Sequence, residues 1–143
     1  MNQVSDKLRA LILCTGNSAR SQMAEGLLRH DDGSIFDVES AGTAPSIVRP
    51  EAITVMKELD IDISGHRSKS VVELQGKRFD YVITVCDNAK ENCPVFFGAT
   101  KRLHRSFEDP AAIVGSEAER LDGFRRVRDE LRTWLHQFAK VKE

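Results

Sequence analysis

The chain has 143 residues, of which 41% are hydrophobic and 30% are charged, and its formal net charge is −1 at pH 7. This length fits a single domain, residues 1–143, that can bury a core without disulfide bonds. The near-neutral charge indicates neither a nucleic-acid surface nor a membrane surface, and no apolar run approaches the roughly 20 residues of a membrane-spanning helix. Residues 1–7 are polar and mixed in charge, unlike a signal peptide. Three cysteines, an odd number, argue against a secreted disulfide framework, so we expect a cytoplasmic protein.

A short apolar run at residues 11–13 leads into the sequence CTGNSARS at residues 14–21. The run is typical of a strand buried on both faces of a parallel sheet, and Thr15 to Ser18 have the chemistry of a tight turn. The order of strand, tight loop and helix turns successive backbone N–H groups toward the loop centre, at the positive end of a helix dipole. We therefore predict a site for a tetrahedral oxyanion. The helix is indicated by apolar residues at helical spacing, namely Met23, Ala24, Leu27 and Leu28.

Cys14 is the candidate nucleophile of this loop. Arg20 carries a planar guanidinium that suits two oxygens of an anion, and these positive groups favour the thiolate of Cys14. Ser21 can donate a hydrogen bond to the sulfur. A lone cysteine at a strand end is usually a small buried hydrophobic residue, and Cys-x5-Arg alone occurs by chance. The complete loop sequence between a buried strand and an amphipathic helix favours catalysis.

The rest of the chain alternates predicted strands with predicted helices. Strands are expected at residues 36–42, 81–85 and 101–105, and helices at residues 50–59, at 71–75 and from 116 or 117 onward, with a loop at 60–70. This alternation predicts an α/β fold, a three-layer sandwich with a four-stranded parallel sheet and helices on both faces. Sites in such sheets lie beyond the carboxyl ends of the strands, where both Cys14 and Cys86 fall.

A polar segment at residues 86–94 places Cys86 and Cys93 seven residues apart. Zinc would need four ligands, usually in tight cysteine pairs, and only His104 is a further candidate. Two unreactive thiols are a second alternative. A redox pair is the third, because the two cysteines can form a disulfide if the segment rearranges to bring their Cα atoms within roughly 7 Å.

Asp109 precedes Pro110 in the loop after the last predicted strand. The proline holds residue 109 in an extended or turn conformation. A carboxylic acid at this edge of the sheet can protonate an oxygen that leaves a tetrahedral anion, so Asp109 is the candidate general acid. An Asp-Pro pair on its own is more often a simple turn.

Together these residues resemble the thioredoxin-coupled arsenate reductases, which share the fold of the low-molecular-weight protein tyrosine phosphatases. The loop and the Asp-Pro pair are common to phosphatases and reductases. Cys86 and Cys93 point to a reductase, as does Gln22, where phosphatases typically carry proline. The similarity runs over nearly the whole chain and includes residues 14–26, 40–42, 60–64, 86–94, 109–111 and 126–130.

The resemblance implies reduction of arsenate to arsenite, for arsenic detoxification, by a relay of three thiols. Cys14 attacks the bound arsenate and Asp109 protonates the leaving oxygen. Cys86 then attacks Cys14 and releases arsenite, and Cys93 passes the disulfide to Cys86–Cys93, which thioredoxin reduces. The relay implies that residues 86–93 move, so we expect them to be the most mobile ordered segment. No bound cofactor or metal, no nucleic acid and no membrane are expected, and the protein is expected to be a monomer. Arsenate would be held by Arg20 and by the loop residues Thr15, Gly16, Asn17, Ser18 and Ala19.

Two residues depart from the family pattern. Many relatives have a second cysteine at the position of Ala19, so no thiol inside this loop can protect Cys14. Some relatives bind potassium beside the loop, and Lys69 replaces an acidic residue of that site. One hypothesis is that the Lys69 ammonium takes the cation's place against Glu25; the alternative is a solvated surface lysine. The positions that match the potassium site are Asn17, Glu25, Ser40 and Lys69.

The main alternative function is a low-molecular-weight protein tyrosine phosphatase, which needs Cys14, Arg20 and Asp109 but neither of the other cysteines. Such an enzyme usually grips the phosphotyrosine ring with aromatic residues, and the only tyrosine, Tyr81, lies in a predicted strand. Weak phosphatase activity is still expected, because the anion site hardly distinguishes phosphate from arsenate. An oxyanion or arsenic sensor is a third alternative, which no DNA-reading segment supports. The four histidines receive no functional role.

Overall fold

The computed structural model describes residues 7–74, 76–87 and 101–142. Within these ranges, the strands β1 (Leu8–Cys14), β2 (Phe36–Gly42), β3 (Tyr81–Thr84) and β4 (Lys101–His104) form one parallel sheet in the order β2-β1-β3-β4. The α-helices are α1 (Arg20–Asp32), α2 (Pro50–Lys57) and α4 (Glu117–Lys142), and the 3-10 helices are η1 (Val71–Leu74) and η2 (Pro110–Ala112). The predicted α/β class with a four-stranded parallel sheet is confirmed.

β1 occupies the centre of the sheet because it pairs with β2 along one edge and with β3 along the other. Its residues Ala10 to Leu13 are completely buried. An uninterrupted apolar run is required here, because neither face of the strand reaches water. Burying each of the larger side chains contributes roughly 1.5–3 kcal/mol to stability before the entropy of ordering is counted.

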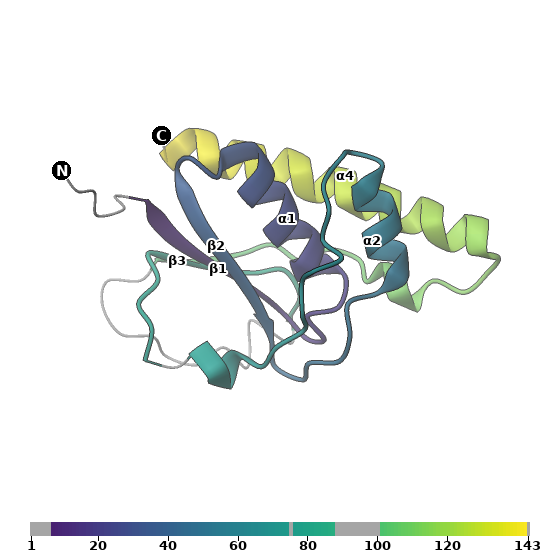
Figure 1. The fold of residues 1–143 in the computed structure, drawn as a ribbon, viewed down its shortest axis with the longest axis horizontal. Coiled ribbons are helices and arrows are strands. Elements are labelled where there is room, and N and C mark those ends of the chain that lie inside the picture. Colours follow the sequence, from purple (N-terminus) through teal and green to yellow (C-terminus); the bar gives the residue numbers. More distant parts are fainter. Residues whose placement is uncertain (1–6, 75, 88–100, 143) are drawn as a thin grey trace.

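The helices α1, α2 and α4 pack against one another, and Figure 1 shows α4 running lengthwise past both other helices. α1 leaves no space for a side chain at Gly26, where an added Cβ would lie 2.8 Å from Ile63 Cγ2. Figure 1 places η1 away from these three helices. The α4 face that meets the core carries buried apolar residues at spacings of three and four, namely Phe124, Val127, Leu131, Leu135, Phe138 and Ala139.

Ion pairs fix α4 to the ends of the shorter helices. The buried Arg128 donates to Val55 O at 2.8 Å and to Glu58 Oε1 at 2.9 Å. Arg132 donates two hydrogen bonds to the carboxylate of Asp31, at 2.8 and 2.7 Å. Burial opposes ionisation of Asp31, but its hydrogen bonds with Arg132 and two histidines outweigh burial and hold its pKa well below the ordinary value.

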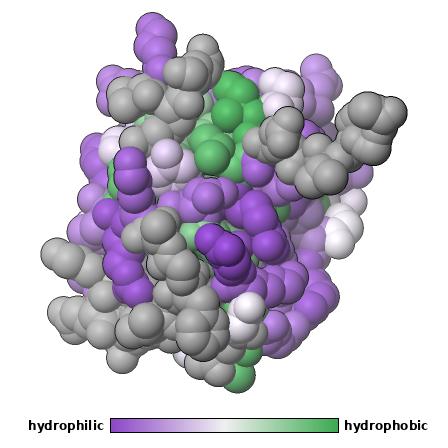
Figure 2. Space-filling model, turned by 90° about the vertical axis from the view of Figure 1, so that its left-hand side faces the viewer, coloured by the Kyte–Doolittle hydropathy of each residue, from purple (hydrophilic) through white to green (hydrophobic). Residues whose placement is uncertain are grey.

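Among the coloured residues of the face seen in Figure 2, hydrophilic ones predominate, and hydrophobic residues reach the surface mainly in one patch. The described segments contain no helix with both the length and the apolar character needed to cross a membrane. Among the residues that the structure describes, three large hydrophobic side chains are exposed, in separate segments, at Ile47, Val72 and Val114.

Candidate active site

Residues 14–20 turn the chain from the carboxyl end of β1 into α1, and segment 43–49 binds their outward-facing carbonyl groups. In a trans peptide the N–H group points opposite to the preceding C=O. The N–H groups that follow these carbonyls therefore point away from segment 43–49 and into the loop, as an oxyanion site requires. The bonds run from Ala44 N to Thr15 O at 2.9 Å, from Ser46 N to Gly16 O at 3.1 Å and from Arg49 N to Ser18 O at 2.8 Å.

Two positions let the loop close tightly. Asn17 has a φ of 47°, in the left-handed region that asparagine enters more readily than most residues. Gly42 ends β2 directly against the loop, where an added Cβ would lie 2.5 Å from Thr15 O and 3.0 Å from Asn17 N. Glycine is needed at residue 42 because no side chain fits between the strand end and the loop.

The sulfur of Cys14 is buried and lies 2.9 Å from Ser21 Oγ. Asn17 Nδ2 donates to Ser21 Oγ at 2.7 Å and to Ser40 Oγ at 2.9 Å. Because Ser21 Oγ already accepts from Asn17, its own proton can be directed at the Cys14 sulfur. A thiolate at this position therefore has a neutral donor held in place by a buried amide.

Gln22, a residue typical of the reductases, stabilises the loop through hydrogen bonds to Asn17. Its Nε2 donates to Asn17 O at 3.1 Å and to Asn17 Oδ1 at 3.0 Å, and its Oε1 lies 2.9 Å from His66 Nδ1. With Nδ1–H donating to Gln22, His66 Nε2 accepts from Arg29 Nη1 at 3.1 Å. Burial, reinforced by the charges of Arg29 and Lys69, lowers the pKa of His66 despite the nearby Glu25 carboxylate. A neutral His66 thus holds Gln22 in place.

Arg20 and Asp109 meet beside the loop. Arg20 Nη1 donates to Phe107 O at 3.0 Å, and Nη2 lies 3.7 Å from Asp109 Oδ2. Asp109 precedes η2, and its Oδ1 accepts from Ala111 N at 3.0 Å, which fixes the carboxylate at the start of that helix. The structure therefore brings together the arginine and the carboxyl that lie 89 residues apart in the chain.

Cys86 follows β3 and reaches the same edge of the sheet as Cys14. The register pairs Leu13 with Thr84, and Val85 N donates to Leu13 O at 2.9 Å. The buried Cys86 Sγ lies 3.3 Å from Thr15 Oγ1, so the second thiol touches the first residue after Cys14.

Cys93 lies outside the described residues, as do residues 88–92 between it and Asp87. The expected pairing of these two thiols and the expected mobility of their segment remain predictions. Within residues 7–74, 76–87 and 101–142, no group of three or more His, Cys, Asp or Glu side chains is arranged to hold a metal ion.

Arg29 is the cation that pairs with Glu25. Glu25 Oε2 accepts from Arg29 Nη2, which also donates to Val38 O at 2.7 Å, and Glu25 Oε1 accepts from Ser40 Oγ at 2.5 Å. Lys69 instead supplies its backbone N–H to Asn17 Oδ1 at 3.0 Å, and among the described ion pairs its ammonium makes none with Glu25. The hypothesis about the Lys69 ammonium is therefore wrong. Glu25 and Arg29 stand one helical turn apart on α1, a spacing from which the sequence could have predicted this pair.

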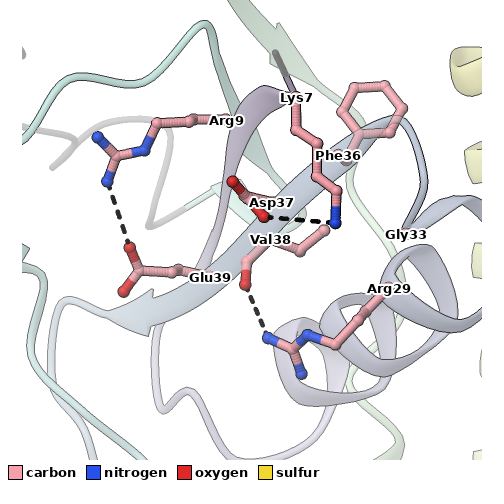
Figure 3. Close-up of a pocket in the computed structure, with 8 residues that line it drawn as sticks. All are labelled: Lys7, Arg9, Arg29, Gly33, Phe36, Asp37, Val38 and Glu39. Carbon is pink, nitrogen blue, oxygen red and sulfur yellow. Dashed lines mark hydrogen bonds and ion pairs between the residues drawn. The ribbon is translucent and has the colours of Figure 1, made fainter. Parts of the chain in front are cut away.

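A cavity of about 520 Å³ lies at the amino-terminal halves of β1 and β2, away from the loop. Figure 3 shows that its charged side chains pair with one another: Lys7 with Asp37 at 3.9 Å and Arg9 with Glu39 at 3.8 Å. Arg29, also in Figure 3, covers the Val38 carbonyl on the outer edge of β2. These contacts stabilise the amino-terminal end of the sheet, and the candidate active site lies at its carboxyl end.

The family model described as low molecular weight phosphotyrosine protein phosphatase matches residues 9–143. A protein named arsenate reductase 2, from Staphylococcus saprophyticus subsp. saprophyticus, is 45% identical over 133 residues, covering 93% of this chain and 97% of the relative. A solved structure titled an arsenate reductase in the phosphate binding state has a TM-score of 0.74 at 29% identity, covering 92% of this chain and 95% of its own. A low molecular weight protein tyrosine phosphatase from T. tengcongensis has a TM-score of 0.76 at 27% identity, with coverages of 94% and 99%.

Proposed function

The chain belongs to the low molecular weight phosphotyrosine protein phosphatase family, and within it we propose that this protein is an arsenate reductase that works by a thiol relay. One observation carries the proposal: the loop that holds Cys14 has a second buried thiol, Cys86, 3.3 Å from Thr15 Oγ1. Ester hydrolysis needs one thiol at such a loop. Reduction needs a second one that can reach the first.

The first step is attack on the bound oxyanion. The loop N–H groups and the Arg20 guanidinium bind the oxygens of arsenate, and the Cys14 thiolate attacks the arsenic. An S–As bond forms and an As–O bond breaks. The departing oxygen is a hydroxyl of the arsenate; Asp109, 3.7 Å from Arg20 Nη2, acts as the general acid and gives it one proton, so that it leaves as water.

The second step carries the redox chemistry. The Cys86 thiolate attacks the sulfur of Cys14, so that an S–S bond forms and the S–As bond breaks. The electron pair of that bond stays on arsenic, which is reduced from As(V) to As(III) and leaves as arsenite. The two sulfurs together are oxidised by two electrons, which balances the step.

The third step returns the site to its reduced form. The Cys93 thiolate attacks Cys86, releases Cys14 as a thiolate and leaves a Cys86–Cys93 disulfide. The dithiol of thioredoxin then reduces this disulfide. The proposal takes the protein to be a cytoplasmic monomer without a bound cofactor, and the resemblance to thioredoxin-coupled reductases supports that assignment.

Single Cys→Ser variants test the relay. Each variant is assayed for arsenate-dependent NADPH consumption with thioredoxin and its reductase, and separately for aryl-phosphate hydrolysis. We expect Cys14→Ser to abolish both activities, and Cys86→Ser and Cys93→Ser to abolish only the first. Full reductase turnover in either of the latter two variants would show that the relay is wrong.

Phosphate-ester hydrolysis is the second candidate, because Cys14, Ser21, Arg20 and Asp109 form a complete site for it. A phosphotyrosine phosphatase would also need aromatic side chains that bind the substrate ring, and Tyr81 is not placed to do so. Tyr81 is buried and packs edge-on against Phe138, with ring centroids 5.3 Å apart. We therefore assign ester hydrolysis as a side activity of the anion site.

A further inference from the structure

His104, a histidine without an assigned role, stands at the end of β4 beside the strand that delivers Cys86. The register pairs it with Thr84 of β3. Its Nδ1 lies 2.8 Å from Thr84 Oγ1, and its Nε2 lies 3.0 Å from Asp87 Oδ1. One imidazole ring therefore bridges the residue two positions before Cys86 and the residue directly after it.

The hydrogen-bond chemistry determines how this bridge is built. The Asp87 carboxylate only accepts, so His104 Nε2 carries a proton, and in the neutral ring Nδ1 accepts from the Thr84 hydroxyl. If the ring gains a second proton, Thr84 Oγ1 accepts from Nδ1 and turns its own proton to Leu103 O, 3.4 Å away. The ring thus keeps both partners in either protonation state.

Backbone bonds already anchor the chain up to Val85. Arg105 N donates to Thr84 O at 3.0 Å, and Phe107 N donates to Val85 O at 3.0 Å. Within the described residues, the contact between His104 and Asp87 extends this anchoring past Cys86. Among the described residues, the hydrogen-bond contact of Cys86 Sγ is with a hydroxyl of the neighbouring loop, at Thr15 Oγ1. The direction of the thiol therefore depends on how firmly the residues on both sides of it are held.

We propose that His104 is a positioning residue for the second step of the relay, because it holds Thr84 and Asp87 and thereby keeps the Cys86 thiol against the Cys14 loop. The inference rests on the proposed reductase function. Cys86 takes no part in attack on the oxyanion. The bridge therefore matters for the transfer of the S–S bond and not for ester hydrolysis, which separates its effect from a general loss of structure.

Two amide substitutions of His104 separate its contact with Asp87 from its contact with Thr84. In His104→Gln the amide nitrogen can reach the place of Nε2 and still donate to Asp87. In His104→Asn the shorter side chain reaches only the place of Nδ1, so it keeps Thr84 and loses Asp87. Asp87→Ala removes the same contact from the exposed side, with little effect on packing because the Asp87 side chain is 74% exposed.

The readout is a single turnover with arsenate of reduced protein in a Cys93→Ser background, which traps the Cys14–Cys86 disulfide of the second step; the reaction is quenched with acid and the disulfide is mapped by mass spectrometry. We expect His104→Asn and Asp87→Ala to slow its formation about fivefold to tenfold, because the hydrogen bond lost is solvent-exposed and contributes less than a buried bond to a charged group. His104→Gln should recover most of the rate. The double variant His104→Asn/Asp87→Ala should be no slower than either single variant, because both remove one contact.

Aryl-phosphate hydrolysis by the same preparations is the control, and its kcat and KM should stay within about twofold of wild type. Equal losses in hydrolysis and in disulfide formation would reduce His104 to a structural residue and overturn the inference. Unchanged disulfide formation in both His104→Asn and Asp87→Ala would overturn it as well. If wild-type protein forms no arsenate-dependent disulfide, it is the proposed function that fails.

Discussion

Substituting Ser21 by alanine isolates the hydrogen bond to the nucleophile. Ser21 Oγ lies 2.9 Å from Cys14 Sγ and accepts from Asn17 Nδ2 at 2.7 Å. A hydrogen bond to a charged group contributes about 1.5–3 kcal/mol, and each 1.4 kcal/mol is a factor of ten in rate. We therefore expect Ser21→Ala to lower kcat about tenfold to a hundredfold in both arsenate reduction and aryl-phosphate hydrolysis.

The same substitution also has a structural cost, because one N–H of the buried Asn17 amide loses its acceptor. An unsatisfied buried donor costs about 1–3 kcal/mol, which should appear as a lower free energy of unfolding in urea. Ser40→Ala is the matched control. Its hydroxyl accepts the other N–H of Asn17 at 2.9 Å but does not contact the sulfur.

The assay measures kcat and KM for aryl-phosphate hydrolysis at 25 °C, together with urea unfolding, for wild type and both variants. Ser40→Ala should lose stability but keep much more of kcat than Ser21→Ala. Equal kcat losses in the two variants would refute the reasoning, because the effect would then come from the loop frame and not from the contact with sulfur. So would a Ser21→Ala variant with more than half of the wild-type kcat.

Three further predictions concern the frame of the site. Gly42→Ala should lower the free energy of unfolding by at least about 1–3 kcal/mol and reduce both activities, because the added Cβ would lie 2.5 Å from Thr15 O; wild-type stability in urea would contradict this. The pKa of Asp31 is lowered in the folded protein, so its contribution to stability is present above the ordinary carboxyl pKa and is lost as the pH falls below it. Between neutral and acidic pH, the free energy of unfolding in urea should therefore fall less for Asp31→Asn than for wild type. Equal falls in the two proteins would contradict this prediction. The pKa of His66 is also lowered, so protonation disfavours the folded state and stability falls as the pH drops below about 6.5. His66→Gln should remove this part of the pH dependence, which a pH series of unfolding curves around that value can detect.

Much of the fold was predictable because local patterns specified it. Residues 36–42 alternate apolar and polar side chains before a glycine, and β2 has these bounds. Pro50 begins α2, as its fixed φ and missing N–H favour. The predicted strand at residues 81–85 delivers Cys86 to the edge of the sheet that Cys14 occupies. Each of these predictions depends on neighbours within a few positions of the chain.

The network around the loop was less predictable, because its partners are far apart in sequence and follow no periodicity. Gln22 meets His66 across 44 residues, and His104 meets Asp87 across 17. A polar side chain in a loop gives no local sign of which distant group it will bind. Glu25 shows the opposite case. Its ion-pair partner Arg29 lies one helical turn away, so the helical spacing predicts this pair and not a pair with Lys69.

By itself the sequence predicted the kind of chemistry: an oxyanion loop with a cysteine and an arginine six positions later. Residue types and short spacings carry that information, because nucleophiles, donors and turns are properties of the local chain. The relay through two further thiols was predicted from the resemblance to the reductases. Only the tertiary structure decided which groups act on one another. Parallel pairing of β1 with β3 sets Cys86 against the Cys14 loop, and pairing of β3 with β4 sets His104 across from Thr84. Such contacts form only after the core has folded and fixed the register, so no local pattern encodes them.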